Sequence, residues 1–174
     1  MVKICQNRIR SRYAFLFSLT SLFILVSQFQ LSAQEMPPRP IGLYALQTLN
    51  FGAFYQGVTG GTMTISPFGS RSSTGDIIPV NLGYLYFPAI FELEGNPGSI
   101  VHYLAGPDAT LNGSYGGSMT LQVGESDIGD PIIITVGPPG RIQIRVGGTL
   151  VVGTPLENPA GSYTGSFMVM FIQE

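Results

Sequence analysis

The chain contains a single histidine, so His102 is the only residue that could serve as an imidazole base. A Ser-His-Asp site needs such a base beside an activated serine, yet no Gly-x-Ser-x-Gly nucleophile motif occurs after residue 33. His102 stands between Ile100 and Leu104 in an alternating segment, which places it on the same strand face as those two aliphatic side chains. A lone histidine does not make a triad. We therefore interpret it as a packing or surface residue and predict no catalytic site and no enzyme activity.

The acidic residues from Glu125 to Asp130 are the best candidates for a metal site. Hard cations such as Ca²⁺ prefer several carboxylate oxygens. The spacing here differs from the Asp-x-Asp-x-Asp-Gly pattern of calcium-binding loops. We interpret the segment as a solvated turn and predict no metal and no other cofactor. Calcium binding is kept as a secondary hypothesis, which a calcium titration would test through a shift in melting temperature.

Seven tyrosines follow residue 33, and two of them are close together in Tyr84-Leu-Tyr86. Exposed aromatic rings can bind sugars, so this pair is the best candidate for a glycan-binding platform. Aromatic residues are also enriched in strands for packing reasons alone. We expect core and edge packing, with glycan binding as the alternative.

The segments that carry these residues have the pattern of β-strands joined by turns. Met63 and Ile65 alternate with threonines, as in a strand with one buried face. Gly60-Gly61 just before them is predicted to form a tight turn. Arg141–Val146 also alternates, with three aliphatic residues facing inward. Turn-forming residues recur roughly every 8–12 residues, which favours an all-β sandwich or barrel.

The two ends of this β region are the best candidates for an assembly edge. We predict a long first strand, Ile41–Phe51, and a last strand, Gly161–Ile172. The first strand has the alternation and length to be donated to the sheet of another subunit, or it pairs within its own domain. The candidate edge residues are Ile41, Leu43, Ala45, Leu49, Phe51, Phe167, Val169 and Phe171.

The N-terminus has the features of an export signal. An uncharged apolar run, residues 14–26, follows a basic segment and precedes Leu31-Ser-Ala33. We predict a cleaved signal peptide at 1–33, an extended proline-rich arm at 34–40 and one β domain at 41–174. We expect the protein in the periplasm, on the cell surface or outside the cell. The basic residues of the signal are Lys3, Arg8, Arg10 and Arg12.

Removal of the signal changes the charge. Four arginines then stand against ten carboxylates, a net charge of −6, with no lysine and no cysteine. Such a surface repels nucleic acid and anionic lipid. We therefore expect no nucleic-acid partner and no stable membrane insertion after signal cleavage.

Four motifs occur in an order that resembles a known family. They are Leu49-Asn-Phe-Gly52, Gly60-Gly-Thr-Met-Thr-Ile65, Val146-Gly-Gly-Thr-Leu150 and Ala160–Val169. The sequence resembles the bacterial secreted domain of unknown function 4402, which is similar to spore-coat-U-like and pilin-type immunoglobulin-like domains. The resemblance implies an extracytoplasmic β-sandwich and no catalytic residues. The family's last strand usually alternates with polar residues to its end, whereas this chain has Met168 and Met170 there.

Together these observations predict a single immunoglobulin-like antiparallel β-sandwich. We expect a non-enzymatic secreted or cell-surface structural protein, of the pilin-like appendage type, that binds itself by strand exchange or homo-oligomerisation, or binds another surface protein. The alternative is an extracellular glycan- or protein-binding module. A small outer-membrane barrel is a third hypothesis, disfavoured because four prolines interrupt the candidate strands. They are Pro67, Pro79, Pro88 and Pro131.

Overall fold

The structure, a computed structural model, describes residues 39–174, and within this range it contains strands and no helix. Every strand pairing is antiparallel, so the predicted all-β antiparallel class is confirmed. The predicted signal peptide and most of the 34–40 arm lie outside the described residues. The strands are β1 (Gly42–Gln47), β2 (Phe54–Ile65), β3 (Arg71–Pro79), β4 (Ala89–Glu94), β5 (Ile100–Ala105), β6 (Ala109–Gly113), β7 (Ser118–Ser126), β8 (Ile132–Ile133), β9 (Ile142–Val152), β10 (Tyr163–Thr164) and β11 (Val169–Gln173).

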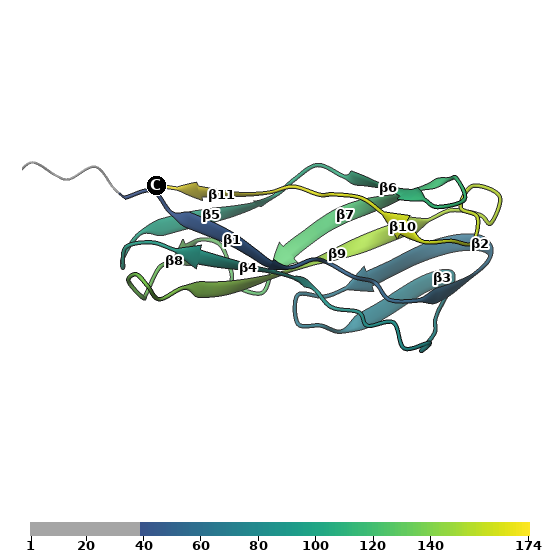
Figure 1. Cartoon of the computed structure of the whole chain (residues 1–174), viewed down its shortest axis with the longest axis horizontal. Helices are drawn as coiled ribbons and strands as arrows, with labels where there is room; N and C mark the ends of the chain where they lie inside the picture. Colours follow the sequence, from purple (N-terminus) through teal and green to yellow (C-terminus); the bar gives the residue numbers. More distant parts are fainter. Residues whose placement is uncertain (1–38) are drawn as a thin grey trace, which may run out of the picture. The chain divides into compact units, whose positions relative to one another are not determined.

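The strands form two sheets (Figure 1). The larger has eight strands in the order β1-β4-β9-β7-β6-β10, with β2 and β3 joined to it through β9, and the smaller has the order β11-β5-β8. Strand β9 is the centre of the larger sheet. It pairs with β7 on one side, and on the other side with β4 through its first half and β2 through its second half.

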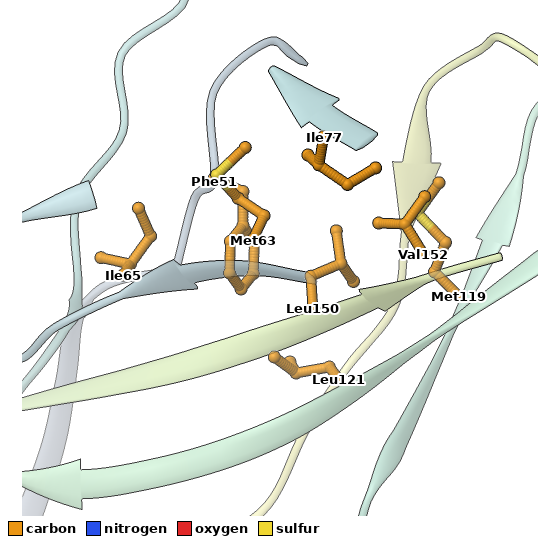
Figure 2. Packing of buried hydrophobic residues seen from close by; sticks show 8 residues of the cluster. All are labelled: Phe51, Met63, Ile65, Ile77, Met119, Leu121, Leu150 and Val152. Carbon is orange, nitrogen blue, oxygen red and sulfur yellow. The ribbon is translucent and has the colours of Figure 1, made fainter. Parts of the chain in front are cut away.

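Two clusters of buried side chains form the core. One gathers residues of β2, β3, β7 and β9 (Figure 2). The other lies where β4 and β9 of the larger sheet face β5 and β8 of the smaller sheet. Leu49 and Phe167 pack against both clusters and join them. The first cluster consists of Phe51, Met63, Ile65, Ile77, Met119, Leu121, Leu150 and Val152, and the second of Ala89, Phe91, Leu93, Val101, Ile132, Ile134, Ile144 and Val146.

Gly60-Gly61 does not form the predicted tight turn, and Gly147-Gly148 does not turn the chain either. Gly60-Gly61 lies inside the continuous strand β2, at a bulge where the register with β3 shifts. The backbone takes a φ of +74° at Gly60. Gly147-Gly148 likewise lies inside β9, at the point where its neighbour changes from β4 to β2. A Cβ atom on Gly147 would lie 2.4 Å from the carbonyl oxygen of Ile65. These glycines therefore permit close approach of neighbouring strands.

The predicted last strand is two strands in different sheets. Strand β10 pairs with β6 of the larger sheet, and β11 pairs with β5 of the smaller sheet. The chain crosses between the sheets at residues 165–168, where a Cβ on Gly165 would clash with the carbonyl oxygen of Thr110. In β11 the side chains of Met170 and Ile172 are exposed, as is Met168 before it. The apolar outer face of this strand therefore faces solvent.

Three further segments form short strands or edge strands. The segment 132–136 is β-branched throughout, yet β8 is only two residues long and Ile133 is 56% exposed. The strand after Tyr84-Leu-Tyr86 begins only at Ala89. Strand β3, which ends at Pro79, is an edge strand that pairs only with β2.

Candidate functional site

Five strands stand at sheet edges in the described part of the chain, and two of them lack the usual protection against pairing with another chain. Edge strands are normally shortened, charged or interrupted by proline. Strand β3 carries Arg71, Asp76 and Pro79, while β8 and β10 have two residues each. Strands β1 (GLYALQ) and β11 (VMFIQ) contain neither a charged residue nor a proline. These two edges are therefore the ones open to another strand.

The two open edges meet. The backbone N–H of Ile41, just before β1, donates to Oε1 of Gln173 at the end of β11, at 3.2 Å. Nε2 of Gln173 donates in turn to the carbonyl oxygen of Arg39 at 3.4 Å. Figure 1 shows the start of β1 and the end of β11 close together near the C-terminus. We call this border of the sandwich the β1/β11 seam.

The backbone of β11 presents unpaired groups at the seam. The N–H of Gly106 donates to the carbonyl oxygen of Met168 and the N–H of Glu174 donates to that of Ile100, both at 3.1 Å. Since pairing alternates along an antiparallel ladder, the N–H and carbonyl groups of every second residue between Met168 and Glu174 point away from β5. An added strand would find the N–H and carbonyl groups of three residues there, which are Val169, Phe171 and Gln173.

The core-facing side chains at the seam are only partly covered. Phe171 packs against the rings of Phe91 and Tyr103, with centroids 6.0 Å and 5.6 Å away. On β1, Leu43 stands opposite the buried Leu93 and so shares its face. Leu43 is nevertheless 44% exposed. The seam therefore leaves apolar core-facing surface open beside unpaired backbone.

The opposite face of β1 is fastened to its own domain. The guanidinium of Arg141 stacks on the ring of Tyr44, with its central carbon 3.8 Å from the ring centroid. The same group binds the carboxylates of Glu92 and Glu94 on β4, each at 3.1 Å. Both hydrogen bonds raise the pKa of Arg141, and the one to Glu92 contributes more than the one to Glu94. In this structure the predicted donor strand is thus paired and anchored within its own sheet.

The structure brings together most, but not all, of the predicted edge residues. Those at the seam are Ile41, Leu43, Ala45, Val169 and Phe171. Phe167 and Leu49 lie between the core clusters instead. Phe51 is only 7% exposed within the core, because β1 ends at Gln47 and the chain then turns inward. Asn50-Phe-Gly52 is the sequence signal that could have indicated this change of direction, because Oδ1 of Asn50 accepts a hydrogen bond from the N–H of Gly52.

His102 has partners that the sequence did not reveal. It faces outward from β5 on the same face as Ile100 and Leu104, as predicted. Its Nδ1 lies 3.1 Å from Oδ2 of Asp130, and its Nε2 lies 3.1 Å from Oε1 of Glu174. Both hydrogen bonds raise the pKa of His102, and the one to Asp130 contributes more than the one to Glu174. The hydrogen bond to His102 also lowers the pKa of Asp130.

The acidic residues between Glu125 and Asp130 contact two different strands. Oδ1 of Asp127 accepts a hydrogen bond from the N–H of Arg145 at 2.7 Å, whereas Asp130 binds His102 and the N–H of Tyr103. Within residues 39–174, no group of three or more His, Cys, Asp or Glu side chains is arranged to hold a metal. The same range contains no helix long and apolar enough to cross a membrane.

The tyrosine pair is more exposed than expected. Tyr84 lies in the segment between β3 and β4 and is 68% exposed. Tyr86 is also exposed, and the guanidinium of Arg71 lies over its ring at 5.0 Å. Nε of Arg71 is buried without a hydrogen-bond partner. Of the expected core and edge packing, the core part is wrong, because both tyrosines lie in an irregular segment outside the strands.

Gln173 is expected to control how firmly the two edges are joined. Replacing it with alanine removes both seam hydrogen bonds, which lowers the free energy of unfolding by roughly 1 kcal/mol. Hydrogen exchange at the N–H of Ile41 should accelerate in the same variant. Gln173→Glu keeps an acceptor for Ile41 and should show less acceleration. Equal exchange in both variants and the native protein would contradict this assignment.

The fold and the seam define a class: an all-β, two-sheet protein whose first and last strands form an open border. The chain belongs to the family described as "Domain of unknown function (DUF4402)", whose model matches residues 42–172. No curated protein and no solved structure matches the chain.

Proposed function

We propose that this protein is a non-enzymatic structural protein of the cell exterior that assembles with other subunits through the β1/β11 seam. The observation that supports it is that two unprotected edge strands meet at their ends, and that their core-facing side chains are partly exposed. Such a border fits β-strand addition, in which backbone hydrogen bonds supply affinity and alternate side chains fill the gap. The export signal predicted at 1–33 supports a location in the periplasm, on the cell surface or outside the cell.

The arrangement favours the seam as the acceptor of a strand. Strand β1 is held by Arg141, Glu92 and Glu94, so donating it would break these contacts. Accepting a strand at β11 keeps the Arg141 contacts and opens only the two Gln173 hydrogen bonds across the seam. The backbone groups of Val169, Phe171 and Gln173 already point outward. The donor is a second copy of this chain or another surface protein, as in a pilin-like appendage.

The test is the molar mass of the purified protein, measured by light scattering over a concentration series. We expect discrete multimers that persist in mild denaturant. Val169→Pro removes an N–H that points away from β5, and edge strands tolerate proline at such positions. This variant should fold and stay monomeric. Leu43→Lys, which places a charge on the exposed core-facing side of β1, should have the same effect.

The matched control is Phe68→Lys, which makes the same kind of change at an exposed residue in the turn between β2 and β3. It should assemble like the native protein. If the native protein remains a monomer at all concentrations, self-assembly is wrong. If both seam variants still form multimers, the seam is not the contact.

A second candidate function is a glycan-binding module, favoured by the exposed rings of Tyr84 and Tyr86 beside Arg71. Aromatic faces and a neighbouring guanidinium can hold a sugar ring. Binding to one member of a polysaccharide panel, weakened by Tyr84→Ala, would support it. No binding to any member would remove it.

A further inference from the structure

One imidazole joins all three strands of the smaller sheet. His102 lies on the central strand β5, Asp130 stands two residues before β8, and Glu174 directly follows β11. The two ring nitrogens contact the two carboxylates at 3.1 Å each, from different sides of the ring. Asp130 and Glu174 are 28 and 72 positions away from His102 in the sequence. A single side chain therefore ties together segments that are distant in the sequence.

This arrangement depends on one proton. A carboxylate only accepts hydrogen bonds, and a neutral imidazole has one N–H and one bare nitrogen. Both contacts are hydrogen bonds only when His102 is protonated. When the proton is lost, the bare nitrogen faces a carboxylate and that contact becomes repulsive.

The contact that fails is the one to Glu174. Oδ1 of Asp130 also accepts a hydrogen bond from the N–H of Tyr103 at 3.1 Å, which keeps this carboxylate in place. Within the described residues, the side chain of Glu174 has no other hydrogen bond or ion pair than that with His102. The neutral ring therefore keeps its N–H toward Asp130.

We propose that His102 holds the end of β11 against β5 only while its imidazole is protonated. Loss of this proton releases the end of β11 from β5. Since β11 forms one side of the seam, this release also loosens the surface that another strand would join. The effect on assembly rests on the function proposed above. The release of β11 itself does not.

Within residues 39–174, no other titratable side chain lies beside His102 on the outer face of the smaller sheet. Beside His102, the outer face of the smaller sheet carries only apolar side chains from β5, β8 and β11. Tyr103 on the same strand points inward, where its O–H donates to the carbonyl oxygen of Gly124, and burial raises its pKa to about 12. The apolar side chains of this face are Ile100, Leu104, Ile133, Met170 and Ile172.

The sign of the pH dependence follows from the two pKa directions. The pKa of His102 is raised from 6.5 in the folded protein, so its stabilisation is complete below that value and is lost as the pH rises through the folded pKa. The pKa of Asp130 is lowered from 3.8, so its contribution is lost only as the pH falls through its folded pKa. His102 therefore holds β11 at pH values between the folded pKa of Asp130 and the folded pKa of His102.

The test uses NMR on dilute, monomeric native protein. The pKa of His102 is measured from its ring signals. Hydrogen exchange then gives protection factors, relative to an unstructured peptide at the same pH, for the N–H groups of Met170, Ile172 and Glu174. We expect these protection factors to fall about two- to fivefold as the pH rises through that pKa, the range for one exposed ion pair.

Glu174→Gln is the decisive variant. Its amide can accept from protonated His102 and donate to the neutral ring, so the pH dependence of β11 should disappear. Asp108→Asn, at an exposed carboxylate in the β5–β6 connection, is the matched control and should keep it. The proposal is overturned if the protection of β11 is constant through the pKa of His102, or if Glu174→Gln behaves like the native protein. Because a monomer is used, either result is independent of whether the seam assembles.

Discussion

Gly60→Ala is expected to lower the free energy of unfolding by about 3 kcal/mol or more. Two effects add at this position. The backbone has a φ of +74°, which an alanine adopts only with strain. A Cβ atom would also lie 2.4 Å from the carbonyl oxygens of Val152 and Gly153, which are backbone atoms that cannot rotate away. The end of β9 would have to move, and with it the buried Val152. Chemical denaturation of the purified protein measures the change.

Gly69→Ala separates the two effects. Gly69 also has a positive φ, +84°, but a Cβ there would meet no atom within 4 Å. The substitution should therefore show the backbone strain alone, on the order of 1 kcal/mol. If the two variants are equally stable, the close contact between the β2 bulge and β9 is not what requires glycine at Gly60.

Leu93→Ala should have a similarly large effect for a different reason. Leu93 on β4 is 0% exposed and belongs to the core cluster between the two sheets. Truncation leaves a cavity in a site closed by buried neighbours on both sheets, and such changes cost about 2–5 kcal/mol. The loss should appear as a lower denaturation midpoint with an unchanged slope.

The control for this core variant is Leu46→Ala on β1. Leu46 is 55% exposed, so the same chemical change should stay within about 0.5 kcal/mol of the native protein. A small effect of Leu93→Ala would mean that the two sheets do not pack over β4 as described.

The parts of the fold that follow from local alternation could be predicted from the sequence. Ala89, Phe91 and Leu93 alternate with Ile90, Glu92 and Glu94 in the sequence, and all three are buried. The inward aliphatic residues of Arg141–Val146 were also assigned correctly, because the outward positions carry charged or polar groups. In both segments the side-chain pattern alone defines the face.

The glycine-rich segments could not be predicted in this way. A glycine pair that turns the chain and one that lets two strands approach have the same local sequence. Only the neighbours distinguish them, and at Gly60 and Gly147 those neighbours are about ninety and eighty residues away on β9 and on β2 respectively. The bonds of His102 to Asp130 and Glu174 were missed for the same reason, since side-chain pairs between strands require the sheet order.

The apolar end of the last strand illustrates a third limit. Alternation gave the two faces of Phe167–Ile172, but both faces are apolar, so the pattern did not decide which one is exposed. The structure places Val169 and Phe171 toward the core and leaves Met170 and Ile172 in solvent. The crossing between sheets before β11 then brings the end of this strand to the start of β1.

The meeting of residues 41 and 173 determines how the domain bears mechanical tension. A force that pulls these two positions apart acts across β1 and β11 at the end where they meet. Their backbone hydrogen bonds to β4 and β5 would then break one after another, as in a zipper. A strand bound along β11 would carry tension parallel to its axis, where all of its hydrogen bonds share the load. The same border would thus be mechanically weak in an isolated subunit and strong in a chain of joined subunits.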